Sequence, residues 1–148
     1  MTIKVEETLR KLSVEIRILE QTAETLSSRI NMVNTMIADL NYASVTLEGL
    51  EKQKENAELL VPIGGGSYIK AKLETPDKVT VGIGAGVSVE KTLQEAKEII
   101  NKRLEDLEKT RVSLEQQLTQ VIERINSDRE KFEELAAEFR KETSPKNV

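Results

Sequence analysis

The chain has 148 residues, of which 32% are charged and only 3% are aromatic, and its net charge is −4. With so few large apolar side chains a compact globular core is hard to assemble, and the composition is typical of long helices that bury a narrow stripe. The sequence contains no cysteine and no histidine. Disulfides and thiolate metal sites are therefore excluded, and the commonest general base and metal ligand are missing. We expect no metal and no other cofactor.

Localisation and partner class are also limited by the composition. No run approaches the length of a membrane-spanning helix, and the first residues, MTIKVEE, lack the apolar core of a signal peptide. We expect a soluble, cytoplasmic protein with no membrane partner. Basic and acidic residues are spread evenly along the chain, so no basic face is available for phosphate contacts and we expect no nucleic-acid partner.

Within residues 1–58 an apolar residue recurs alternately every four and every three positions from Val5 to Leu40, and Ser44 is the first interruption. This is the heptad spacing of a coiled coil. The positions of this seam are Val5, Leu9, Leu12, Ile16, Leu19, Ala23, Leu26, Ile30, Val33, Ile37, Leu40 and Leu47. This spacing predicts an N-terminal coiled-coil helix. The alternative, one helix of a compact bundle, usually needs a wider apolar face.

Toward the end of this helix, apolar residues also occur off the seam. They are Met32, Met36, Tyr42, Ala43 and Val45. We expect this end of the helix to contact something besides its coiled-coil partner. Gly49 weakens a helix by about 1 kcal/mol relative to alanine, and we interpret it as a site of close packing.

Residues 90–142 repeat the heptad pattern and predict a C-terminal coiled-coil helix. The apolar seam positions are Leu93, Ala96, Ile100, Leu104, Leu107, Leu114, Leu118, Val121, Ile125, Phe132, Leu135 and Phe139. Arg111 and Asp128 also fall in the seam, where a polar residue fixes register at a cost in stability or extends out of the seam. We expect the second. Residues 143–148 predict a short disordered tail.

The two helices are similar in length and are predicted to pair as an antiparallel hairpin. In that arrangement Val5, Leu9 and Leu12 lie near Phe132, Leu135 and Phe139. From the residues alone, these distal side chains either close the end of the coil or bind a visiting polypeptide.

Residues 59–89 form a separate segment, here called the hub, which contains every glycine except Gly49. Apolar and polar residues alternate in it, which predicts four strands in two β-hairpins joined by glycine-rich turns. Four short strands cannot cover their own apolar faces and edges, so we expect the hub to assemble with other subunits. The residues predicted to mediate this oligomerisation are Leu60, Val61, Ile63, Ile69, Ala71, Leu73, Val79, Val81, Ile83, Val87 and Val89.

The glycine runs do not match nucleotide-binding motifs. Gly82 and Gly84 begin a pattern like the dinucleotide-binding motif, but the third glycine that the motif requires would be at position 87, which is Val87. The glycine run at residues 64–66 is not followed by the Lys-Ser/Thr of a phosphate-binding loop. Tight turns between strands account for the glycines. No carboxylate has a partner that would make an acid–base pair, so the sequence offers no catalytic residue and we expect no enzyme.

A long helix, two β-hairpins and a second long helix resemble the alpha subunit of archaeal prefoldin. The closest similarity lies in the hub, in the segments LVPIG (60–64), YIKAK (68–72) and VGIGAGVSVEKT (81–92). A beta-type subunit would have a single hairpin. The resemblance implies a hexamer of two alpha and four beta subunits, whose hairpins join an intersubunit β-barrel with coiled-coil tentacles.

The same resemblance implies a chaperone that captures unfolded polypeptides at the tentacle tips without ATP and passes them to a group II chaperonin. It assigns client contact to the distal residues Val5, Leu9, Leu12, Phe132, Leu135, Ala136 and Phe139. The rival hypothesis is a structural scaffold or filament-forming protein whose hub only polymerises. A tRNA-gripping coiled coil is disfavoured by the acidic balance.

Overall fold

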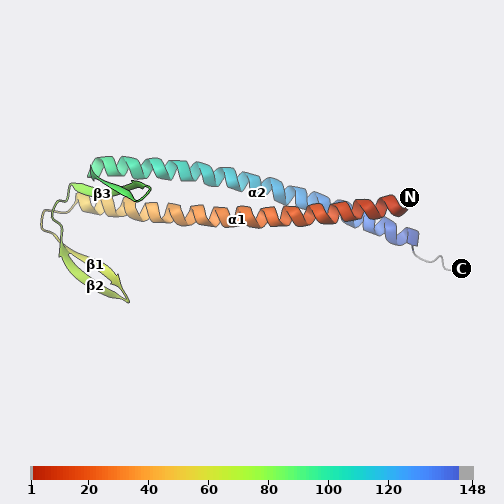
Figure 1. The fold of residues 1–148 in the computed structure, drawn as a ribbon, viewed down its shortest axis with the longest axis horizontal. Helices are drawn as coiled ribbons and strands as arrows, with labels where there is room; N and C mark the ends of the chain where they lie inside the picture. The colour runs from red at the N-terminus through yellow and green to blue at the C-terminus, as the bar shows by residue number, and fades with distance from the viewer. Residues whose placement is uncertain (1, 144–148) are drawn as a thin grey trace. The chain divides into compact units, whose positions relative to one another are not determined.

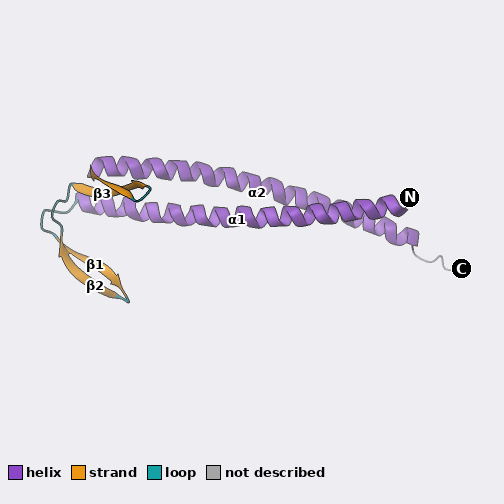
Figure 2. Cartoon of the chain, viewed as in Figure 1, coloured by secondary structure: helices purple, strands orange, loops and turns teal. Residues whose placement is uncertain are grey.

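A computed structural model describes residues 2–143. It contains two long helices, α1 (Thr2–Glu51) and α2 (Leu93–Thr143), and the segment between them holds all four strands (Figures 1 and 2). The strands are β1 (Glu58–Gly64), β2 (Ser67–Lys72), β3 (Lys78–Gly84) and β4 (Val87–Thr92). The chain divides into two compact units, one of residues 2–34 with 109–143 and the other of Thr35–Glu108. Each helix contributes one segment to each unit.

The heptad seam predicted for each helix is confirmed by burial. All of the predicted seam positions are buried or half-buried, whereas most positions between them are exposed. In the first unit the buried apolar residues are Leu12, Leu26, Val33, Leu114 and Ile125. The predicted fold class, two long helices with coiled-coil seams that flank two antiparallel β-hairpins, is therefore confirmed.

In the first unit the helical segments run in opposite directions (Figure 1), and two ion pairs join them. Arg124 Nη2 lies 2.8 Å from Glu15 Oε1, and Arg129 Nη2 lies 2.6 Å from Glu20 Oε1. Such exposed pairs are each worth about 0.2–1 kcal/mol, so the apolar seam supplies most of the stability of this unit.

Asp128 contradicts the expectation that the polar seam residues extend out to solvent. Its side chain is only 1% exposed, and the Nε of Arg124, one helical turn earlier, lies 3.4 Å from its Oδ1. The short aspartate side chain cannot reach past the neighbouring helix, as a long lysine or arginine can. Arg111 is half-buried. The seam therefore contains a buried carboxylate whose nearest cation is on its own helix.

The second unit has a small apolar core where the helices meet β3. Its buried residues are Leu47, Val81, Leu93, Ala96 and Ile100. Lys97 Nζ forms an ion pair with Glu51 Oε1, and the Arg103 guanidinium donates a hydrogen bond to the Gly82 carbonyl oxygen. The apolar core and the Arg103 hydrogen bond hold β3 against the helical segments of this unit, and the Lys97–Glu51 ion pair joins those segments to each other.

Two antiparallel hairpins, β1–β2 and β3–β4, form as predicted, and each is a separate two-stranded sheet. Their turns are equivalent: Gly65 and Gly66 have φ angles of +57° and +74°, and Ala85 and Gly86 have +50° and +74°. Positive φ at both central residues is the signature of a type I′ turn, whose twist matches the flanking strands. The interpretation of the glycine runs as tight turns is confirmed.

The ends of the helices differ from the predicted boundaries. α1 ends at Glu51 rather than near residue 58, because a turn with Asn56 at φ +65° leads into β1. α2 begins at Leu93 rather than at residue 90, because β4 runs on to Thr92. The Thr92 hydroxyl accepts a hydrogen bond from the Glu95 backbone N–H and donates one to the Glu95 carboxylate. This is a helix cap of the Thr-x-x-Glu type.

The described part of the chain contains no helix long and apolar enough to cross a membrane. α2 extends through Thr143. The disordered tail predicted for residues 143–148 otherwise lies outside the described residues.

Candidate assembly and polypeptide-binding surfaces

The hairpin β3–β4 is covered in part by the helices of its own unit, at Val79 and Val81. Val81 is buried and Val79 packs beside it against Leu47, Leu93 and Ala96. The side chains of Val79 and Val81 are therefore covered by residues of their own unit.

The hairpin β1–β2 is not covered in this way, and in Figure 1 it extends away from the helical segments of its unit. Val61 and Ile69, which are paired across the two strands, are 43% and 53% exposed. Leu60 is 65% exposed and Ile63 is 59% exposed. A two-stranded hairpin with apolar residues in solvent and two open edges is not stable alone. The β1–β2 hairpin is thus a surface whose apolar side chains and strand edges are left uncovered by the described residues of its own unit.

The residues predicted for oligomerisation fall into three groups. Val81 is buried, and half-buried positions are Ala71, Leu73, Val79 and Val89. Exposed positions are Leu60, Val61, Ile63, Ile69, Ile83 and Val87. The exposed group carries the apolar area that a partner could bury. Val79 and Val81 instead serve the core of their own unit.

The distal residues predicted to bind clients all lie in the first unit. Leu12 is buried, and the half-buried residues are Val5, Leu9, Phe132, Leu135, Ala136 and Phe139. All of them except Ala136 are seam positions, and all are at least partly buried, so each offers a visiting polypeptide at most part of its side chain.

More accessible apolar side chains lie on α1 in the same unit, and the heptad analysis missed them. Ile3, Val14 and Ile18 are 72%, 55% and 56% exposed. They lie outside the seam, so only a search for exposed apolar residues on a second helix face could have found them. Val14 and Ile18 line one shallow apolar depression with the side chains of Arg10, Lys11, Glu15 and Leu19.

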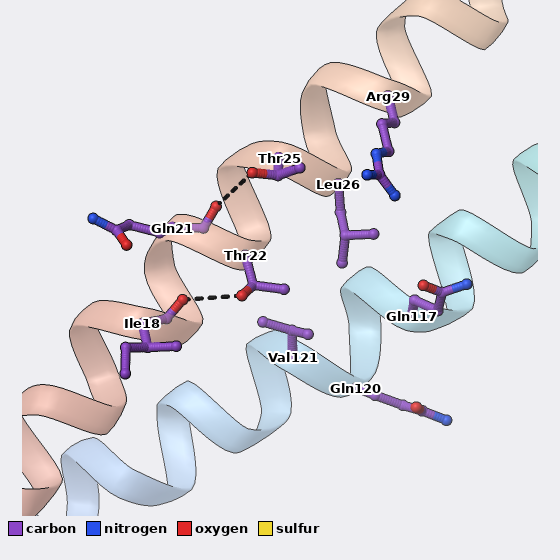
Figure 3. A pocket seen from close by; sticks show the side chains of 9 residues that line it. All are labelled: Ile18, Gln21, Thr22, Thr25, Leu26, Arg29, Gln117, Gln120 and Val121. Carbon is purple, nitrogen blue, oxygen red and sulfur yellow. Dashed lines mark hydrogen bonds between the residues drawn. The ribbon is translucent and has the colours of Figure 1, made fainter.

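A groove of about 500 Å³ lies between the two helices of the first unit (Figure 3). Leu26 and Val121 belong to the seam, and the other lining residues are Ile18, Gln21, Thr22, Thr25, Arg29, Gln117 and Gln120. The Thr22 hydroxyl donates to the Ile18 carbonyl oxygen at 3.0 Å, and the Thr25 hydroxyl donates to that of Gln21 at 3.1 Å. With hydroxyls bound to their own backbone and one cation in the lining, the groove has no acid–base pair for catalysis.

Within residues 2–143 the acidic side chains do not gather in threes as a metal site would require. The candidate surfaces are an uncovered hairpin in one unit and exposed apolar side chains in the other. Two long helices with heptad seams, separated in the chain by two β-hairpins, are the class of protein that these features define.

Comparisons with known proteins place this class in one family. Residues 19–138 match the model of the prefoldin family, described as prefoldin subunit. The chain is 38% identical over 122 residues to prefoldin subunit alpha of Methanococcoides burtonii, covering 82% of this chain and 88% of that protein. It is 30% identical over 128 residues to prefoldin subunit alpha of Pyrococcus horikoshii, with 86% of each chain covered.

A solved structure agrees with these sequence matches. The filamentous prefoldin of Methanocaldococcus jannaschii superposes with a TM-score of 0.62 at 29% identity, covering 82% of this chain and 95% of that chain. The chain belongs to the prefoldin family and is a chaperone subunit of that family. The resemblance to the alpha subunit of archaeal prefoldin, inferred from the hub segments, is confirmed.

Proposed function

We propose that this chain is the alpha-type subunit of a prefoldin hexamer, with two alpha and four beta subunits, that holds unfolded polypeptides without ATP. The alpha type is supported by the two hairpins and by the curated relatives, which are alpha subunits. Assembly is supported by the exposed apolar residues of β1–β2.

The observation that carries the holding function is the exposure of Ile3, Val14 and Ile18 in the first unit. They lie on the same unit as the half-buried distal residues Val5, Leu9, Leu12, Phe132, Leu135, Ala136 and Phe139. We propose that both sets contact clients. Each contact is weak, but several subunits of one assembly that engage one client raise its effective concentration, so the total affinity rises without a deep pocket.

Charged side chains surround these apolar residues and keep the surface soluble. Glu130, Lys131, Glu133 and Glu134 are all exposed. We propose that this cluster contacts a group II chaperonin during delivery of the client. Reversing the sign of these residues should slow client transfer while leaving client capture unchanged, and normal transfer by the reversed variant would refute the role.

Light scattering of a chemically unfolded client, diluted into buffer without ATP, tests the holding function. The assembled complex should suppress aggregation. A variant with Ile3→Ser, Val14→Ser and Ile18→Ser should suppress it less, because these side chains are exposed and their loss does not open the seam. A variant with Phe132→Ser and Phe139→Ser tests the distal seam, with helical circular dichroism as the control for folding. No suppression by the wild-type complex would exclude the holding function.

Filament formation is a second candidate function, because the structural relative from Methanocaldococcus jannaschii is filamentous. In that case the hub of this chain would pair with further copies of itself. Negative-stain electron microscopy of the chain, with and without a beta subunit, separates the two. Long filaments without client protection favour the scaffold, and discrete particles with protection favour the holding chaperone.

A further inference from the structure

One face of α1 in the second unit carries no charge. It consists of Thr35, Ala38, Asn41, Tyr42, Val45 and Gly49, here called the uncharged face. At about 100° per residue these positions share one side of the helix, away from the seam residues Ile37, Leu40 and Leu47. Every residue of the uncharged face is exposed, with Tyr42 at 80% and Val45 at 68%.

The lack of charge is unusual for a solvent-facing surface of this chain, in which 32% of residues are charged. The exposed side of α2 in the same unit carries Glu98, Lys102 and Glu105, as the outer surface of a coiled coil normally does. Depletion of charged residues together with an exposed aromatic is instead the composition found at the centre of a protein–protein interface.

Gly49 provides an independent observation on the same face. A Cβ atom placed on Gly49 would meet nothing within 4 Å, so the chain's own described packing does not require a glycine there. Glycine inside a helix is less favourable than alanine, so this residue weakens α1 without a benefit inside the subunit. A glycine does allow another chain to approach the helix backbone closely, and Ala38 on the same face is also small.

We infer that the uncharged face is covered by a neighbouring subunit of the prefoldin assembly, in continuation of the interface made by β1–β2. The face ends at Gly49, α1 ends at Glu51, and β1 begins at Glu58, so the two surfaces are joined by one short turn in the same unit. Strands that pair with β1–β2 bring the rest of their subunit to this region. The inference rests on the proposed assembly and adds to it a second, helical contact.

Two substitutions test this contact in the full chain, produced alone and together with the prefoldin beta subunit of the same source. Gly49→Ala should raise the melting temperature of the chain alone by about 2–4 °C, because helix propensity improves and the added methyl group meets open space. In the complex the same methyl group should raise the dissociation constant, measured by dilution and native mass spectrometry. Val45→Lys should raise that dissociation constant about tenfold or more.

Matched controls lie outside the uncharged face. Ser28→Ala should also stabilise α1, and Val112→Lys places a lysine at another exposed valine, on α2; neither should change assembly or client protection. If the Gly49→Ala and Val45→Lys variants both assembled as tightly as the wild-type chain, the inference would be overturned. If they assembled normally but protected clients less, this face would be a client surface, which would also overturn the inference. Failure of the wild-type chain to assemble with the beta subunit would instead contradict the proposed hexamer itself.

Discussion

Asp128 is a buried carboxylate in an otherwise apolar seam. Within the described part of the chain, neither of its oxygens has a hydrogen-bond partner, and only the Arg124 guanidinium, at 3.4 Å, balances its charge. Moving a charge out of water costs free energy, so the presence of a buried ion pair is weak evidence that the pair stabilises the fold. Replacing buried ion pairs with apolar residues is often stabilising.

We therefore expect Asp128→Leu to raise the free energy of unfolding by about 1–3 kcal/mol. The measurement is thermal or urea unfolding of the chain followed by circular dichroism. Arg124→Gln is the informative comparison, because it leaves the carboxylate buried without its cation and should destabilise. A lower melting temperature for Asp128→Leu would show that the carboxylate has a partner in the assembled coil.

The turn residues Gly65 and Ala85 occupy equivalent positions with similar φ angles, +57° and +50°. An alanine in the left-handed region costs about 1–2 kcal/mol relative to its right-handed conformation. Ala85→Gly removes this cost but adds chain entropy to the unfolded state, so we expect a net stabilisation below about 1 kcal/mol. Because β3–β4 packs on the core of its unit, the gain should appear in the global melting temperature.

The reciprocal substitution is Gly65→Ala. The β1–β2 hairpin packs on no core within its own unit, so its destabilisation should appear as faster hydrogen exchange of the β1–β2 amides and not in global unfolding. Equal effects of the two substitutions on the melting temperature would contradict the difference in coverage between the hairpins.

At the scale of elements, the start of α2 is set by its cap. The Thr92 hydroxyl satisfies the Glu95 N–H at the first turn, where backbone donors lack helical partners. We expect Thr92→Ala to cost about 1 kcal/mol in stability. Thr119→Ala is a suitable control, because the Thr119 hydroxyl only bonds back to the Glu115 carbonyl oxygen within the helix, and its removal should leave stability unchanged or slightly raised.

The helices and hairpins could be predicted from sequence because their periodicities are distinct. A spacing of three and four over Val5–Leu40 has no strand interpretation, and the alternation around Ile69 and Val81 has no helical one. The cap at Thr92 was missed because the strand β4 and the helix α2 adjoin without a loop. Local pattern alone does not separate two elements that share a boundary residue.

The candidate surfaces were harder to predict than the elements. Seam spacing identifies the residues that a coil buries. Leu12, to which the family resemblance assigned client contact, is one of these residues and is buried. Exposed residues such as Val14 and Ile18 follow from three-dimensional burial and not from spacing. The side chain of Asp128 was placed wrongly because the sequence does not say how far a short side chain can extend past the opposing helix.

At the scale of the whole molecule, assembly should depend on the uncovered hairpin and not on long-range charge. Ile69 is exposed in the single chain, so Ile69→Lys should leave the helical circular dichroism unchanged. It should nonetheless raise the dissociation constant of the complex at least about tenfold, equivalent to about 1.4 kcal/mol. Size-exclusion chromatography with light scattering measures the outcome. An intact complex would move the interface to another part of the hub.

The same interface should tolerate salt. Surface ion pairs are screened strongly at about 1 M salt, where the Debye length is about 3 Å, whereas apolar burial is not weakened by salt in this way. The complex should therefore remain assembled when sodium chloride is raised from about 0.1 to about 1 M. Dissociation over that range, seen by light scattering, would indicate an interface dominated by charge.

The exposed edges of β1–β2 also bear on how the subunit must be made in a cell. Before it meets its partners, a newly synthesised chain presents unpaired strand edges and apolar side chains, the features that make polypeptides aggregate or attract proteases. A surplus of this subunit over its partners should therefore be short-lived. Matched synthesis of the subunits would protect each one, so the supply of partner strands would set how much of this protein accumulates.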